Sequence, residues 1–154
     1  MLRGQQPWYF SALAGLSHVK GMAGAGWGSV RVRPRVPNAL AGVALRLATD
    51  RGEFAVQWTQ CNATGLNATH FAITVSIPVG TRAELCVPTL DRPVESVAIV
   101  ELAGANGTIS KTVWRDGKSL GLEGCSGATI DEWGGAVCFG CGSGAYSFGV
   151  INAG

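Results

Sequence analysis

Apolar and polar residues alternate along most of the chain, which is the period-two pattern of half-buried β-strands. The clearest case is the pair of segments 43–47 and 54–58, in which every second residue is apolar. A polar turn, Asp50-Arg51-Gly52, separates them, and two alternating segments around such a turn predict a β-hairpin. Trp58 lies in phase with the apolar face of its segment, so we expect its side chain in the core.

The same pattern recurs at intervals of roughly ten residues, with Gly, Pro or Asn between the segments. Further predicted strands are 30–33, 71–77, 82–87, 96–102, 108–114, 136–139 and 146–150. Residues 117–135 carry six glycines and little periodicity, which predicts a loop with at most a brief strand. The run Gly140-Cys-Gly-Ser-Gly144 predicts a turn that needs positive φ. Eight or nine short strands indicate an all-β fold, an antiparallel, jelly-roll-like β-sandwich.

The N-terminal segment has a different period. Between Trp8 and Leu16 the apolar residues recur at spacings of three and four, and Pro7 precedes them, so the pattern predicts a short α-helix. A signal peptide is the alternative, with Arg3 before the apolar run and Ala23-Gly24-Ala25 as a cleavage site. We therefore divide the chain into residues 1–26, a helical segment and linker, and residues 27–154, the sandwich.

Composition excludes several classes of protein. The 154 residues are 47% hydrophobic and 14% charged, whereas disordered chains are poor in apolar residues and rich in charge. The net charge is only +2, so we expect neither nucleic acid nor a membrane surface as a partner. No apolar run reaches the roughly 18 residues of a membrane-spanning helix.

Three N-glycosylation patterns bear on the compartment. They begin at Asn62, Asn67 and Asn106, and three matches in a short chain favour a secretory route. The alternative is that turns rich in Asn, Thr and Gly produce the pattern by composition alone.

The five cysteines are an odd number, so at least one is unpaired or pairs outside the chain. Cys138 and Cys141 form a Cys-x-x-Cys, for which we expect buried thiols or one local disulfide. A structural zinc site needs four ligands, but no second cysteine pair follows, and His18 and His70 lie far away in the sequence. The sequence therefore predicts no metal site and no cofactor.

Candidate catalytic groups are few. A glycosidase needs two carboxylates placed across a cleft, and the acidic residues fall at turns or on polar strand faces. Asp131 and Glu132, beside Trp133, form the only acid pair next to an aromatic residue in a loop and are candidate site residues. Trp114 and Trp133 are the candidates for an exposed platform that stacks on sugar rings. We expect no catalytic residue in this chain.

Several segments together resemble the C-terminal β-sandwich domain of bacterial-type α-L-rhamnosidases. They are Trp27–Pro34, the hairpin strand Arg51–Trp58, the run Ile73–Thr81 with Ala83 and Val87-Pro88, and Gly142–Phe148. The segment Trp8–Leu16 similarly looks like the last helix of the helical barrel that precedes this domain in the family. The resemblance spans nearly the whole chain.

The resemblance implies an accessory role. In the family an (α/α) barrel carries the acidic residues that cleave terminal L-rhamnose with inversion, and none of those residues can be transferred to this sequence. It implies a non-catalytic domain that packs against a catalytic barrel of the same or a sister chain. The alternative is a freestanding module that binds rhamnose-containing glycans through Trp114 or Trp133. An exposed apolar patch on the N-terminal helix and the adjoining sheet would favour the first function, and an exposed aromatic residue in a concave groove would favour the second.

Overall fold

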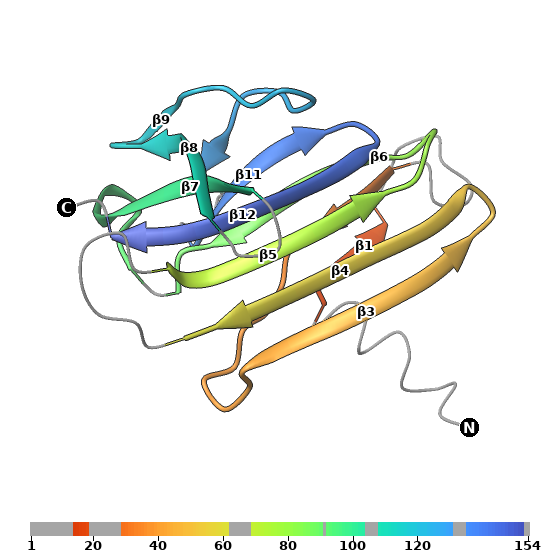
Figure 1. Cartoon of the computed structure of the whole chain (residues 1–154), viewed down its shortest axis with the longest axis horizontal. Coiled ribbons are helices and arrows are strands. Elements are labelled where there is room, and N and C mark those ends of the chain that lie inside the picture. Colours follow the sequence, from red (N-terminus) through yellow and green to blue (C-terminus); the bar gives the residue numbers. More distant parts are fainter. Residues whose placement is uncertain are drawn as a thin grey trace.

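The computed structural model describes residues 14–18, 29–61, 69–90, 92–103, 108–130 and 135–152, and these residues form two β-sheets (Figure 1). Among the described residues, the 3₁₀ turn η2 (Val94–Ser96) precedes strand β7 (Val97–Ala103). Within these ranges, no helix is long and apolar enough to cross a membrane. The fold class expected from the alternating pattern is therefore confirmed as all-β.

One sheet has seven strands in the order β3-β4-β5-β12-β7-β8-β9, and all its pairs are antiparallel. Figure 1 shows this sheet from β3 at its lower edge to β9 at its top. The strands are β3 (Gly42–Thr49), β4 (Gly52–Gln60), β5 (Thr69–Ile77), β12 (Gly144–Asn152), β7 (Val97–Ala103), β8 (Thr108–Arg115) and β9 (Lys118–Ser119). The predicted hairpin is present as β3 and β4, with Leu45 opposite Val56.

The other sheet has five strands, none longer than seven residues, in the order β1-β2-β6-β11-β10. They are β1 (Leu16–His18), β2 (Ser29–Val32), β6 (Arg82–Pro88), β11 (Ala136–Cys141) and β10 (Thr129–Ile130). One pair, β2 with β6, is parallel, so the sandwich is not wholly antiparallel as expected. A parallel pair cannot be joined by a tight turn, and here the whole of β3, β4 and β5 lies between its two strands.

The apolar faces of the two sheets meet in one core. This core takes Val30, Leu85 and Phe139 from the five-stranded sheet and residues such as Trp58 and Phe148 from the seven-stranded sheet. The Phe139 and Phe148 rings stack across the two layers with centroids 5.2 Å apart. Trp58 is 1% exposed, which confirms the burial predicted from its phase in the strand.

The N-terminal segment differs from its prediction where the structure describes it. Residues 1–13, which hold most of the expected helix, lie outside the described residues. Leu16 instead begins strand β1, which pairs with β2, and its side chain is 2% exposed. Gly15 has φ +77°, and a Cβ there would lie 2.1 Å from the carbonyl carbon of Arg33. The sandwich therefore begins before residue 26, because β1 belongs to its sheet.

Candidate functional site

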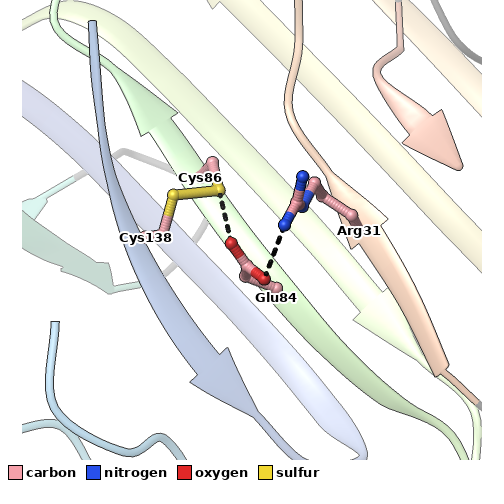
Figure 2. A network of polar contacts seen from close by, with 4 residues as sticks. All are labelled: Arg31, Glu84, Cys86 and Cys138. Carbon is pink, nitrogen blue, oxygen red and sulfur yellow. Dashed lines mark hydrogen bonds and ion pairs between the residues drawn. A yellow bond between two sulfur atoms is a disulfide. The ribbon is translucent and has the colours of Figure 1, made fainter. Parts of the chain in front are cut away.

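A polar network lies on the outer face of the five-stranded sheet, the side away from the core (Figure 2). Glu84 and Cys86 are two residues apart on β6, so they project from the same face. Strand pairing places Cys138 of β11 directly opposite Cys86, and Arg31 of β2 directly opposite Glu84. Three strands that are distant in the sequence thus bring four functional side chains together.

Glu84 is the centre of this network. Its Oε2 lies 3.3 Å from Nη2 of Arg31, and its Oε1 lies 3.4 Å from Sγ of Cys86. Cys86 is bonded to Cys138 in a disulfide, so its sulfur has no hydrogen to donate. The 3.4 Å approach, dashed in Figure 2, is therefore a contact between a carboxylate and a disulfide sulfur rather than a hydrogen bond.

Exposure changes sharply across the network. The Arg31 and Glu84 side chains are 48% and 37% exposed, whereas Cys86 and Cys138 are only 2% and 5% exposed. Ala136 shares the buried cluster with the two cysteines. The two sulfurs are thus sheltered, whereas the Glu84 carboxylate beside them is partly exposed.

A second disulfide joins Cys125 to Cys141, the last residue of β11. The predicted local disulfide between Cys138 and Cys141 is therefore wrong, although both cysteines are oxidised. Residues three apart in a strand point to opposite faces: Cys138 lies in the outer cluster and Cys141 in the core. The odd cysteine is Cys61, which is free and exposed.

Tyr146 holds the loop around the second disulfide. Its hydroxyl donates to the carbonyl oxygen of Gly142 at 3.0 Å, with the carbonyl of Gly124 at 3.3 Å. Burial raises the pKa of the Tyr146 hydroxyl. A Cβ on Gly124, which has φ +86°, would lie 2.6 Å from that hydroxyl oxygen. The turn predicted at residues 140–144 is present, and Gly144 has φ +141°.

His70 is the most buried described ionisable group outside the disulfides, at 3% exposure. Arg92 donates through Nη2 to Nδ1 of His70 at 3.2 Å and through Nη1 to Oδ1 of Asn152 at 3.0 Å. Burial, and then the positive charge of Arg92, lower the pKa of His70. Neutral His70 accepts a hydrogen bond from Arg92. Because Arg92 also binds Asn152, it connects β5 to the end of β12.

The aromatic platform predicted at Trp114 is not available to a sugar. Its side chain is 2% exposed and belongs to the core, because a bulge in the pairing of β8 with β7 turns it inward together with Val113. Asp131, Glu132 and Trp133 lie outside the described residues, as do Asn62, Asn67 and Asn106.

The outer face of β3, β4 and β5 carries a shallow groove of about 290 Å³. Hydrogen-bonding side chains along it include Gln57, Thr74 and Ser76. At one end Arg46 donates to Glu53 across the hairpin at 2.8 Å. The polar residues of this groove follow the ordinary pattern of the solvent-facing side of alternating strands, so the sequence does not distinguish the groove from any other exposed face.

Fold and surface together define a two-sheet β-sandwich with oxidised cysteines on one sheet. Residues 15–109 match the family model of the bacterial alpha-L-rhamnosidase C-terminal domain. That match covers more than half of the chain, and the chain belongs to this family. No curated protein sequence matches the chain.

Two solved structures share the fold. The alpha-L-rhamnosidase from Dictyoglumus thermophilum aligns with a TM-score of 0.64 and 22% sequence identity, over 94% of this chain and 13% of that chain. The Streptomyces avermitilis alpha-L-rhamnosidase complexed with L-rhamnose aligns with a TM-score of 0.56 and 22% identity, over 94% of this chain and 10% of that chain. The chain thus spans only a small part of either protein.

Proposed function

We propose that this chain is a non-catalytic accessory domain of an α-L-rhamnosidase-like glycoside hydrolase, and that it packs against a helical catalytic barrel. The observation that carries the proposal is the family match to residues 15–109. The likeness of nearly the whole chain to about a tenth of two large rhamnosidases supports it.

The described carboxylates support a non-catalytic role. Glu84 faces Arg31, and Glu53 faces Arg46. A glycosidase needs two carboxylates that face each other across a cleft. Glu84 lies on β6 of the five-stranded sheet and Glu53 on β4 of the seven-stranded sheet, so these two residues do not form such a pair.

A chimera tests the packing role. This chain would replace the matching region of the Dictyoglumus thermophilum rhamnosidase, with simple deletion of that region as the control. We expect the chimera to be more soluble and more heat-resistant than the deletion variant, and to hydrolyse an aryl α-L-rhamnoside. A chimera no better than the deletion contradicts the packing role.

The isolated chain tests the non-catalytic role. We expect no hydrolysis of an aryl α-L-rhamnoside above the buffer rate. Turnover that disappears in Asp131→Asn or Glu132→Gln would show that the chain is itself an enzyme.

The polar groove favours a second function, binding of a rhamnose-containing glycan. Its amide and hydroxyl groups at Gln57, Thr74 and Ser76 match the hydroxyl groups of a sugar. In NMR spectra of the isotope-labelled chain, titration of L-rhamnose should shift the backbone amide signals of β4 and β5. Gln57→Ala should make these shifts smaller. Shifts confined to residues outside the groove would contradict this function.

A further inference from the structure

We propose that reduction of the Cys86–Cys138 disulfide creates a binding site for a thiophilic divalent cation of the Zn²⁺ class. The ligands are the two thiolates and the Glu84 carboxylate, whose ligand atoms all lie within 4.8 Å of one another. The proposal does not rest on the proposed packing role, because all three ligands belong to this chain.

The register of the sheet sets the positions of the two sulfurs. Cys86 and Cys138 are directly opposite on β6 and β11, with Cα atoms 3.9 Å apart. Tetrahedral Zn–S bonds of about 2.3 Å place two sulfurs roughly 3.8 Å apart. Side chains that project in parallel from opposite positions reach that separation by rotation about χ1, so the backbone need not move.

Glu84 is already divided between two roles. Its Oε1 faces the sulfur of Cys86, and its Oε2 faces Arg31, so one oxygen can bind the cation while the other keeps its ion pair. Arg31 then holds the carboxylate in position, as outer partners of metal ligands commonly do.

The charges of this arrangement also balance. Two thiolates and one carboxylate carry three negative charges, which a divalent cation and the Arg31 guanidinium together neutralise. Such a balance limits the cost of gathering charges on a partly buried surface.

Burial divides the site into a closed side and an open side. The sulfurs are sheltered, while Glu84 is partly exposed, so the cation enters past the carboxylate. Three protein ligands leave the fourth position of a tetrahedral ion for water.

The redox step is a two-electron thiol–disulfide exchange. A dithiol reductant attacks one sulfur, the Cys86–Cys138 bond breaks, and the reductant leaves as its own disulfide. Each cysteine gains a proton, and the cation displaces both protons when it binds. In the reduced, metal-free state the Cys86 thiol has a hydrogen that it can donate to Oε1 of Glu84, 3.4 Å away in the disulfide form.

The sequence could not show this site. The Cys-x-x-Cys and the two histidines do not supply a set of metal ligands, whereas the strand register pairs Cys138 with Cys86 and adds Glu84. A Glu-x-Cys within a strand was the available signal.

The test uses the full chain, reduced with a phosphine and desalted, with Cd²⁺ as the spectroscopic probe and Zn²⁺ in competition. We expect one tightly bound Cd²⁺ per chain, seen as thiolate-to-cadmium absorption, and at least tenfold weaker binding by the oxidised chain. The bound cation should also restore slow hydrogen exchange to β6 and β11. A reduced chain that binds no cation, or that unfolds and is not refolded by Zn²⁺, overturns the proposal.

Three variants separate this site from the other cysteines. Glu84→Gln keeps the disulfide and the shape of the side chain, and it should weaken Cd²⁺ binding of the reduced chain at least tenfold. Cys138→Ala should abolish tight binding. The matched control Cys125→Ala should leave it unchanged, and equal losses in the two cysteine variants would overturn the proposal.

Discussion

The two sheets of the sandwich are stabilised in different ways. The seven-stranded sheet has strands of up to nine residues, and β3, β4 and β5 follow one another directly in the chain. The five-stranded sheet pairs short segments that are far apart in the sequence, and both disulfides end on its strand β11. The disulfides thus occur in the sheet whose strands are short and far apart in the sequence. A cross-link between distant segments stabilises the fold most, because it restricts the unfolded chain most.

Removing the disulfides should have the largest effect on this contrast. The cross-links close loops with sequence separations of 52 and 16 residues, so the chain-entropy model predicts losses of about 4 kcal/mol for Cys86→Ala/Cys138→Ala and about 3 kcal/mol for Cys125→Ala/Cys141→Ala. Denaturant unfolding measures both. Hydrogen exchange should accelerate first in the five-stranded sheet. Equal acceleration in β4 and β5 would show that the disulfides stabilise both sheets alike.

Truncation of the N-terminus tests the edge of the five-stranded sheet. Deletion of residues 1–20 removes β1 and the buried Leu16, and loss of a buried leucine alone costs about 2–5 kcal/mol. Deletion of residues 1–13 retains every described contact and is the matched control. If the two truncated chains unfold at the same denaturant concentration, β1 does not contribute to the sandwich.

Tyr146 connects β12 of the seven-stranded sheet to the loop of the second disulfide. Tyr146→Phe removes the donor to Gly142 and should lower the free energy of unfolding by about 0.5–1.5 kcal/mol. Thr74→Val, which removes an exposed hydroxyl contact to Ser147, is the control and should cost less. A larger loss in the control would mean that this connection is unimportant.

The smallest effect should come from pH. Since the pKa of His70 is lowered in the folded state, the unfolded chain binds a proton more readily below about pH 6.5. The free energy of unfolding should therefore fall as the pH drops from 7 through this range, and His70→Gln should reduce the slope. An identical slope in the variant would show that other groups cause the pH dependence.

Most of the seven-stranded sheet was predictable, because alternation of apolar residues is a local signal that each strand carries by itself. The 43–47 and 54–58 hairpin and the burial of Trp58 followed from it. Trp114 was misplaced because a bulge changes the phase of its strand, and a bulge leaves no mark in the alternation.

The five-stranded sheet and the candidate site were less predictable, because both depend on pairing between distant segments. The helical spacing around Leu16 gave no sign of a strand that pairs with residues 30–32. Cys86 and Cys125 stand in no motif, so their partners follow only from the register of β11.

The position of β11 near the end of the sequence also affects synthesis. Chains emerge from the ribosome N-terminus first, so neither disulfide can form until residues 138 and 141 have been made. Until then Cys61, Cys86 and Cys125 coexist as thiols in a chain whose β3, β4 and β5 are already complete. A wrong pairing with Cys61 is thus a hazard of the nascent chain, and a disulfide isomerase should speed its maturation more than that of a Cys61→Ser variant.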